Sequence, residues 1–466
     1  MFVFPPPGIS SATREGRRAP VCWSLRLAVG SIVALVLCIA TESAPAFTSR
    51  NADTMLKDFL SAFLIENGNL AHWRRKTGQP EQEWFWTTAE MIEMVEDAHD
   101  RTGSSATADT IRKLVDGFIA KHGSDWAWNE YNDDIMWAVS AFVRAYHITG
   151  NQNYLTIARS NFDMCYARAW NTDGNGGMRW KQTGTSKNAI AQSTAAIAAY
   201  RLFLATGERS YRATASRIYN WQKANQVYAN GHVRDNPPGN NDPTTYNQGM
   251  FIGIANYLND VEWATKAMDY LRTMGSPTPT SEGENILLDY PVDNDLAGFN
   301  GIAYRWAAKF MLDRGLEEKY LAWLRANANQ ALRVRNSAGL TWSRMHQQTP
   351  DEPMISWACS NAVVALNVVP PEDPDRKAVK VKSPKTVRIE TRKAKYLVKG
   401  TARKTVSTVY LQNKSAAKKK LIEAKGVATW KAKVPLRMGL NRINVLADTG
   451  GKKPGRITTI RIVRVR

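Results

Sequence analysis

Hydrophobic and polar positions change their period once along this chain of 466 residues. Over residues 48–368 apolar residues recur with helical spacing, and in the run 135–148 they cover nearly the whole helix circumference. Beyond the Pro-rich segment 370–375, apolar residues alternate with Lys and Arg at a period of two, which indicates short strands. The pattern predicts a large all-α region followed by a small all-β region.

Helix ends recur through the first region at similar intervals. Gly103, Gly150 and Gly207 each follow an apolar run, 47 and 57 residues apart, and Gly315 follows another. Such intervals suit repeated helical hairpins, and about 320 residues would hold six of them. The pattern therefore predicts an (α/α)₆ toroid with buried inner helices, and an open solenoid is the alternative. Polar loops expected to border a groove are 171–187, 229–247 and 275–300.

The second region predicts a β-sandwich. Its expected strands, separated by Gly-containing turns, are 386–391, 396–399, 406–412, 428–434, 442–446 and 457–465. This many short strands in about 85 residues indicates an immunoglobulin-like sandwich. The predicted domains are a signal peptide at 1–46, an (α/α)₆ domain at 47–369, a Pro-rich and basic linker at 370–384, and a basic β-sandwich at 385–466.

The N-terminus has the form of a secretory signal. Four Arg precede an apolar stretch at 27–40, and Ala44-Pro45-Ala46 offers a cleavage site. This stretch is short for a membrane span, and an uncleaved signal anchor is the alternative. No other apolar run approaches spanning length. We expect a mature protein that does not span a membrane and is secreted, periplasmic or associated with the cell surface. Its cysteines, Cys165 and Cys359, are expected to be buried thiols, although a bridge between them stays open.

Charge is divided unevenly between the two regions. Residues 376–466 hold 27 Lys and Arg against three acidic residues, a net charge of +24, whereas residues 48–375 carry a net charge of −6. The basic region is expected to bind an anionic polymer or cell surface by charge. Protection of edge strands by Lys is the alternative. Specific nucleic-acid binding is not expected, because the protein is expected to be exported.

Two adjacent acids, Asp133 and Asp134, stand at the head of the all-round apolar run. Acids often cap helices and suit the macrodipole, so capping is the simplest interpretation. A cap on an interior helix, however, points into the interior or into a pocket. Trp126, Trp128 and Tyr131 lie just upstream, and 14 of the 16 Trp lie between residues 48 and 375. Paired carboxylates among aromatic residues are typical of enzymes that cleave glycosidic bonds.

Several segments in this order carry a resemblance to a known family: 85–90, 131–137, 176–180, 187–190, 245–249 and 299–305. Together they resemble glycoside hydrolase family 76, the α-1,6-mannanases, over most of residues 55–368. The resemblance implies an (α/α)₆ toroid and retention of configuration, with Asp133 as nucleophile and Asp134 as acid/base. It implies no cofactor, and no Cys/His cluster has metal-ligand spacing. Adjacent acids also reach the short carboxyl separation of retaining enzymes more easily than the longer one of inverting enzymes.

The expected substrate is a polysaccharide of the α-mannan class. Side chains expected to contact it are Trp86, Trp126, Trp128, Tyr131, Asn132, Trp180, Asn188, Tyr246, Asn247, Gln248, Phe299 and Arg305. Asp289, Asp293 and Asp295 crowd one loop, and some of them are expected to face sugar hydroxyls. Arg179, where the family typically has a second Trp, either contacts an anionic substituent or stacks on Trp180.

The sequence thus predicts a secreted retaining endo-α-1,6-mannanase that works by double displacement. A transglycosylase of the same fold and a non-catalytic surface glycan-binding protein are the alternatives.

Overall fold

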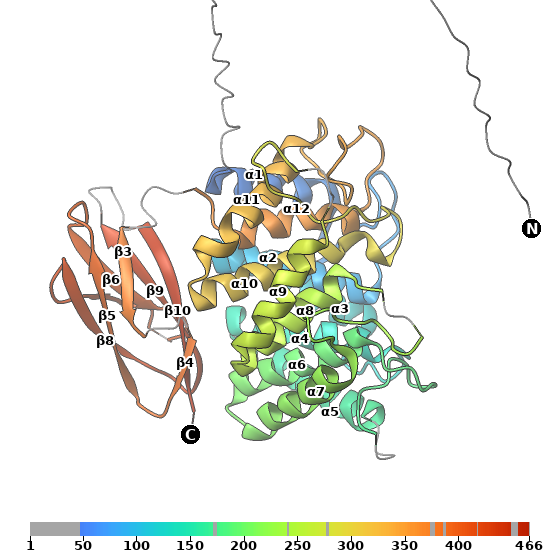
Figure 1. Cartoon of the computed structure of the whole chain (residues 1–466), viewed down its shortest axis with the longest axis horizontal. Helices are drawn as coiled ribbons and strands as arrows, with labels where there is room; N and C mark the ends of the chain where they lie inside the picture. The colour runs from blue at the N-terminus through green and yellow to red at the C-terminus, as the bar shows by residue number, and fades with distance from the viewer. Residues whose placement is uncertain are drawn as a thin grey trace, which may run out of the picture. The chain divides into compact units, whose positions relative to one another are not determined.

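The computed structural model describes residues 47–465, apart from 171–174, 240–241, 276–278, 373–377, 385–387, 417 and 449–454. The expected signal peptide at 1–46 lies outside the described residues. A helical region is followed along the chain by a β region (Figure 1). The predicted change from helix to strand is therefore confirmed. No helix in the described part of the chain is long and apolar enough to cross a bilayer.

The helical region comprises α1 (Ser49–Phe63), α2 (Phe85–Thr102), α3 (Ser105–His122), α4 (Asn132–Thr149), α5 (Gln152–Ala169), α6 (Ala189–Thr206), α7 (Arg209–Gln226), α8 (Thr245–Leu258), α9 (Val261–Thr273), α10 (Phe299–Arg314), α11 (Glu317–Arg333) and α12 (Ser356–Val368). The strands β1 (Leu64–Asn67) and β2 (Leu70–Trp73) form a hairpin after α1, and the 3₁₀ helix η1 (Asp295–Gly298) precedes α10. The regular elements of this region are therefore almost all helices, as its apolar spacing predicts.

Six helices, here called the inner helices, are buried along most of their length: α2, α4, α6, α8, α10 and α12. In α6 every residue from Ala189 to Leu204 is buried. Each inner helix packs against the next one along the chain, and α12 packs against α2. The six outer helices bury mainly one face, as Met55, Leu56 and Phe59 do in α1. Along the chain, helices that are buried along most of their length thus alternate with helices that bury only one face.

The C-terminal ends of the inner helices confirm the predicted glycine caps. Gly103, Gly150, Gly207 and Gly315 follow α2, α4, α6 and α10 in the left-handed conformation, which other residues adopt only with strain. Helix α8 ends at Asn259, with φ 68°, because asparagine tolerates this conformation better than most residues. After each cap the chain enters an outer helix.

Charged side chains occupy the interior between the inner helices, and they lie there in pairs. Arg144 binds Glu93 at 2.9 Å and Asp97 at 2.8 Å. Arg305 binds Asp97 at 2.6 Å, and Arg201 also binds Glu93. Burial raises the pKa of Glu93, but the nearby Arg201, Arg305 and Arg144 outweigh it and bring that pKa well below its usual range. Glu93 therefore stays charged inside the protein because arginines surround it, whereas burial raises the pKa of Glu90 to about 7 and that of Glu96 well above its usual range.

The β region comprises β3 (Val379–Ser383), β4 (Arg388–Thr391), β5 (Lys395–Ala402), β6 (Thr408–Asn413), β7 (Leu421–Glu423), β8 (Thr429–Pro435), β9 (Gly439–Asp448) and β10 (Gly455–Arg464). They form a five-stranded sheet in the order β4-β10-β9-β6-β7 and a three-stranded sheet in the order β3-β5-β8. The six predicted strands match β4, β5, β6, β8, β9 and β10. The range 370–384 was predicted as a linker, but it contains strand β3. The segment forms a strand because its few apolar residues alternate with Lys, as in the other strands.

One apolar core joins the two sheets of the β region. Val398 and Trp430 of the three-stranded sheet pack in the same cluster as Val409, Ile443 and Ile460 of the five-stranded sheet. This packing bears out a two-sheet arrangement, whereas its immunoglobulin-like character stays a prediction.

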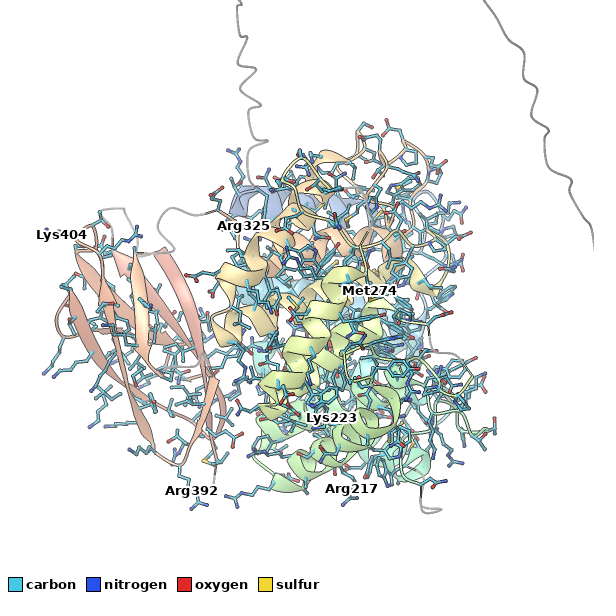
Figure 2. The ribbon with its side chains drawn as sticks, viewed as in Figure 1. Arg217, Lys223, Met274, Arg325, Arg392 and Lys404 are labelled. Carbon is cyan, nitrogen blue, oxygen red and sulfur yellow. The ribbon has the colours of Figure 1, made fainter. Side chains whose placement is uncertain are left out.

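The outer face of the five-stranded sheet contacts the inner helices. Leu440 and Val463 belong to the apolar core of the helical region, and Arg442 forms an ion pair with Asp100 of α2. At the start of the predicted linker, Arg325 (labelled in Figure 2) donates to the carbonyl of Pro370 at 3.0 Å. The described residues from Phe47 on therefore form one compact unit. Cys165 and Cys359 are buried free thiols, as expected.

Candidate active site

The adjacent acids Asp133 and Asp134 occupy the first turn of α4. The cap position itself belongs to Tyr131, whose side chain makes no capping hydrogen bond. Neither acid forms an ion pair with a described Lys, Arg or His. Since the first N–H groups of a helix have no partner within the helix, they favour negative charge at this position. The pair is thus positioned by the helix start without serving as its cap.

Asp133 is almost entirely buried, with 8% of its surface exposed. Trp180 Nε1 donates to Asp133 Oδ2 at 3.2 Å, and Asp133 Oδ1 has no hydrogen-bond partner among the described residues. Burial raises the pKa of Asp133, whereas the backbone N–H groups of Asp133 and Asp134 and the Trp180 indole favour the charged form. Asp133 therefore has a described hydrogen-bond donor at Oδ2, the Trp180 indole, whereas its Oδ1 has no described partner.

Asp134 is half-buried and has fewer donors. Asn129 Nδ2 donates to Asp134 Oδ2 at 3.1 Å. Burial raises the pKa of Asp134 well above its usual range, and the negative charge of Asp133 raises it further. Two neighbouring acids thus have different surroundings: Asp133 is better placed to ionise, and Asp134 to keep its proton. This division is what a nucleophile and a proton donor require.

Tryptophans from three inner helices gather beside the pair. The Trp86 ring of α2 lies 6.2 Å from the Trp137 ring of α4 and 5.0 Å from the Trp357 ring of α12. Trp357 Nε1 donates to the Asp295 carbonyl at 2.8 Å. The Asp295 carboxylate in turn raises the pKa of Asp134, which places it close to the proton donor. The first turns of these helices therefore meet at one end of the helical region, around the acids.

A second aromatic group comes from α8, α10 and the loop before α6. Tyr246 and Phe299 stack with ring centroids 3.6 Å apart and an interplanar angle of 7°. The rings of Tyr131 and Trp180 meet edge to face at 5.2 Å. Burial raises the pKa of the Tyr246 hydroxyl well above its usual range, and the nearby Asp235 and Asp133 carboxylates add to this rise. Tyr246 is therefore a neutral hydroxyl close to the acids.

The structure adds a third acid, Asp235, that sequence reasoning missed. Asn247 Nδ2 donates to Asp235 Oδ1 at 2.8 Å and Asn188 Nδ2 donates to Oδ2 at 3.2 Å. Burial raises the pKa of Asp235, and its charge in turn raises the pKa of Asp133. Asp235 lies in the loop 229–247, which was expected to border a groove. That expectation was the only signal, because an isolated Asp in a polar loop has no motif.

Of the residues predicted to bind substrate, seven lie around the pair and Asp235: Trp86, Tyr131, Trp180, Asn188, Tyr246, Asn247 and Phe299. Asp293 and Asp289, from the loop that also carries Asp295, differ in their surroundings. Asp293 is exposed, and Asp289 lies 2.8 Å from His346 Nδ1. Of the three acids in that loop, Asp295 is therefore the one that lies near the pair.

Two predicted substrate-binding amides are fully buried and bonded to protein. Asn132 Oδ1 accepts from Arg168 Nε at 2.8 Å, and its Nδ2 donates to the Arg179 carbonyl at 2.8 Å. Gln248 binds backbone atoms of the turn 231–233. The contacts of both side chains hold neighbouring loops in place rather than presenting an amide to a ligand.

Three further predicted residues lie apart from the acids. Trp126 is fully buried, and its Nε1 donates to the Gly123 carbonyl at 3.0 Å. Trp128 is 59% exposed on the same loop. Arg305 binds Glu90 at 2.5 Å within the charged interior. Their positions in sequence near the motifs therefore do not place them beside the pair.

Arg179 does not stack on Trp180. Its guanidinium donates to the Arg168 carbonyl, whereas Lys181 Nζ lies 4.3 Å from the Tyr131 ring centroid and 5.2 Å from that of Trp180. The cation beside these rings is thus the residue after Trp180 rather than the residue before it.

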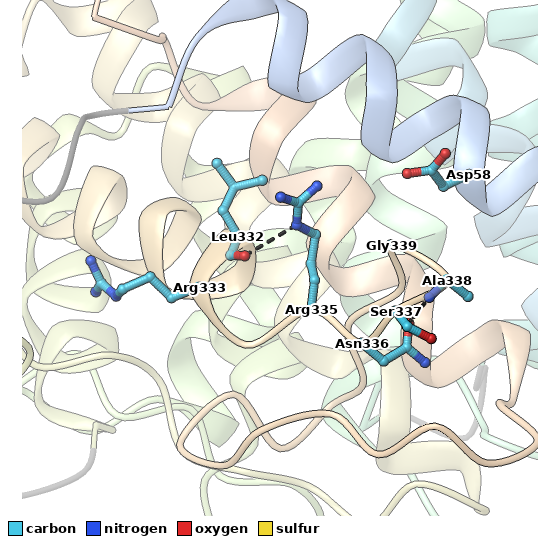
Figure 3. A pocket seen from close by; sticks show the side chains of 8 residues that line it. All are labelled: Asp58, Leu332, Arg333, Arg335, Asn336, Ser337, Ala338 and Gly339. Atoms are coloured by element: carbon cyan, nitrogen blue, oxygen red, sulfur yellow. Dashed lines mark hydrogen bonds between the residues drawn. The ribbon is translucent and has the colours of Figure 1, made fainter.

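An open depression of about 480 Å³ lies elsewhere, between α1 and the turn after α11 (Figure 3). Asp58, Leu332, Arg333 and residues 335–339 line it, and none of the aromatic or acidic residues around Asp133 does. The depression is therefore not part of the candidate active site.

Comparisons with known proteins agree on one family. The sequence model of glycosyl hydrolase family 76 matches residues 48–370. A search of curated proteins found no match.

Solved structures with the same fold come from several organisms. The GH76A α-1,6-mannanase of Salegentibacter sp. HEL1_6 is 24% identical with a TM-score of 0.62, over 69% of this chain and 98% of that one. An inactive variant of that enzyme was solved with α-1,6-mannotriose. Dfg5 from Chaetomium thermophilum, in complex with glucosamine, is 17% identical with a TM-score of 0.54, over 70% of this chain and 94% of that one.

Proposed function

The chain belongs to glycosyl hydrolase family 76, and on this premise we propose that it is a retaining endo-α-1,6-mannanase. The observation that carries the proposal is the pair in the first turn of α4, the buried Asp133 and the half-buried Asp134, without a cationic partner among the described residues. Buried acids usually need such a partner, so an unpaired couple at the meeting point of aromatic side chains suits catalysis.

In the proposed mechanism Asp133 is the nucleophile and Asp134 the acid/base. Asp133 Oδ1, which has no described partner, attacks the anomeric carbon while Asp134 gives its proton to the leaving glycosidic oxygen. The bond to the leaving sugar breaks and a covalent glycosyl–Asp133 ester forms. Asp134, now ionised, takes a proton from water, which attacks the same carbon and releases the sugar with retained configuration. The Trp180 indole holds Asp133 Oδ2 and so fixes which oxygen attacks.

The fold proposed for this mechanism is an (α/α)₆ toroid. The inner helices pack in a closed sequence from α2 to α12 and back to α2, and an outer helix packs beside each of them. Such closure favours the toroid over an open solenoid, in which the first and last helices would stay apart. We assign the β region to an immunoglobulin-like sandwich on its five-stranded and three-stranded sheets with a shared core.

We also propose that the protein is exported and cleaved after Ala46. The Arg-rich start, the short apolar stretch and the small residues before the cleavage site support this proposal. N-terminal sequencing of the secreted protein should begin at Phe47, and a mature protein that begins at Met1 would contradict it.

The activity test uses α-1,6-mannan and reduced α-1,6-mannooligosaccharides, with products followed by size and by the anomer first released. The expected result is shorter oligosaccharides released as the α-anomer. An activated fluorosugar should label Asp133, and Asp133→Asn should abolish the label. Asp125→Asn is the matched control, because Asp125 is an exposed acid on the loop just before the pair.

The outcomes separate the competing functions. Products longer than the substrate would identify a transglycosylase. Binding of the oligosaccharides without any turnover would identify a glycan-binding protein. Release of the β-anomer, or labelling of another residue, would overturn the assignment of Asp133.

A further inference from the structure

The outer face of the sheet β3-β5-β8 is built from lysines. Along β5 and β8 the residues alternate between the core and solvent, as the period of two requires. Val398, Trp430, Ala432 and Val434 are buried against the other sheet. The exposed basic residues of the three strands are Lys380, Lys382, Lys395, Lys399, Lys431 and Lys433, and the strands contain no Asp or Glu.

Strand register arranges these lysines in a compact grid. Lys399 of β5 lies directly opposite Lys431 of β8, and Lys431 in turn pairs with Lys425 just beyond the sheet. Opposite residues point to the same face, so three ammonium groups stand in one row at roughly 4.8 Å per strand. Lys433 lies roughly 7 Å along β8 from Lys431 and opposite Leu397. Lys395 lies two such intervals along β5 from Lys399 and opposite Pro435. We call the set Lys395, Lys399, Lys425, Lys431 and Lys433 the lysine face.

Among the residues that the structure describes, the lysine face has no ion-pair partner. None of its members forms an ion pair with a carboxylate among the described residues. Of the acids in the β region, Glu390 of β4 binds Arg212, which belongs to the helical region. Like charges directly opposite each other in a sheet are destabilising. The row therefore lowers the stability of the sheet unless an outside anion neutralises it.

Protection of sheet edges does not explain this arrangement. Edge protection requires Lys on strands with unpaired backbone groups. Strand β5, however, is the central strand of its sheet, paired on one side with β3 and on the other with β8. Lys395 and Lys399 thus stand where no edge needs protection. The alternative of edge protection accounts at most for lysines on β3 and β8.

We propose that the lysine face binds an acidic polysaccharide, with repeated carboxylate, sulfate or phosphate groups along the chain. Its row of three ammonium groups, with two more along the strands, matches repeated anions on an extended polymer. It presents no aromatic ring on which neutral sugars could stack, since Trp430 is buried. Leu397, 39% exposed, is the one large apolar side chain of these three strands at the surface, too little for insertion into a bilayer. The choice of a glycan rests on the proposed function.

The test compares two variants of the full chain with equal loss of charge. The first replaces Lys399, Lys425, Lys431 and Lys433 with Gln. The second, a matched control, replaces exposed lysines outside the face with Gln: Lys57, Lys418, Lys419 and Lys420. Binding to polygalacturonate is measured by titration calorimetry at low and high salt, with neutral mannan as a second ligand. Circular dichroism and melting curves check that both variants are folded.

The lysine-face variant should bind polygalacturonate about tenfold or more weakly at low salt, and the control should change by less than about twofold. Equal losses in both variants would show that net charge alone attracts the polymer, and would overturn the proposal. The proposal would also be overturned if the wild-type chain did not bind polygalacturonate but bound vesicles with 30% phosphatidylserine, or if it bound duplex DNA more tightly than polygalacturonate.

A separate measurement keeps this proposal distinct from the enzymatic one. Hydrolysis of short neutral α-1,6-mannooligosaccharides should be the same in the wild type and in both variants. If the wild type does not hydrolyse them, the proposed activity fails while the binding result still stands. If the wild type hydrolyses them but neither variant changes polymer binding, the proposed role of the lysine face is refuted while the proposed activity stands.

Discussion

The helical region and the β region use charged side chains in opposite ways. In the interior of the helical region, Arg305 lies between Glu90 and Asp97, and the charges there are bonded to one another. On the outer face of the sheet β3-β5-β8, Lys399 and Lys431 stand opposite each other with no described carboxylate beside them. Burial explains the difference, because a charge inside a protein needs a partner whereas water solvates an exposed one.

Charged groups that depart from these two rules are the ones that indicate function. In the interior, an acid without a cationic partner is uncommon, and the buried Asp133 and the half-buried Asp134 are two adjacent ones. On the surface, single lysines need no explanation, but a row of them without a counter-charge does.

The catalytic pair should give the largest effect. Asp134→Asn removes the proton donor and should lower kcat/KM by about 10²–10⁴-fold. Asp133→Asn removes the nucleophile and should lower it at least as far. The fold should survive both changes, because each replaces a carboxylate with an amide of the same shape. Initial rates on mannooligosaccharides measure the loss, and wild-type rates in either variant would refute the assignment.

A paired interior charge should matter for stability. Arg305→Met leaves Glu90 and Asp97 without this partner and should lower the free energy of unfolding by about 3–5 kcal/mol. Lys431→Gln changes an exposed charge and should stay within about 0.5 kcal/mol of the wild type. Urea unfolding followed by circular dichroism measures both. Similar losses in the two variants would remove the distinction between the regions.

Asp235→Asn should shift the pH profile. The negative charge of Asp235 helps to raise the pKa of Asp133, so its removal favours the ionised nucleophile and lowers that pKa. The acidic limb of kcat/KM, where Asp133 gains a proton, should therefore move to lower pH. Asp293→Asn, an exposed acid on another loop, is the control and should leave the limb in place. An unmoved limb in Asp235→Asn would place this acid outside the electrostatics of the pair.

The smallest effect should come from the lysine face. Lys399→Thr removes a like-charge contact with Lys431 and puts a good strand former on β5. The free energy of unfolding should rise by about 0.2–1 kcal/mol at low salt. The gain should shrink at high salt, where exposed charges are screened. A loss of stability at low salt would show that these lysines do not repel one another.

Patterns local to the chain determined a good part of this protein by themselves. Apolar spacing predicted the buried helix after Asp133, glycines predicted the helix ends, and the alternation of apolar residues with Lys predicted most strands. The acids of the pair could also be found, because two charges beside a run that is apolar all round are anomalous in the sequence itself.

Tertiary structure alone decided which polar residues meet. Asp235 comes to Asp133 because Asn188 and Asn247, at the starts of two inner helices, hold its loop. Gln248 is the next residue along the chain from Asn247, yet it points to a backbone turn and is buried. Adjacent positions on a helix face about 100° apart, so sequence proximity to a motif does not fix direction.

The same division holds for charge. The sequence determined that the C-terminal region is basic, since composition needs no fold. Only strand register decided that Lys399, Lys431 and Lys425 form one row, and only sheet order decided that β5 is central. Pairing between distant segments determines both the lysine row and the order of the strands. A shift of one residue in register would turn these side chains from solvent to core.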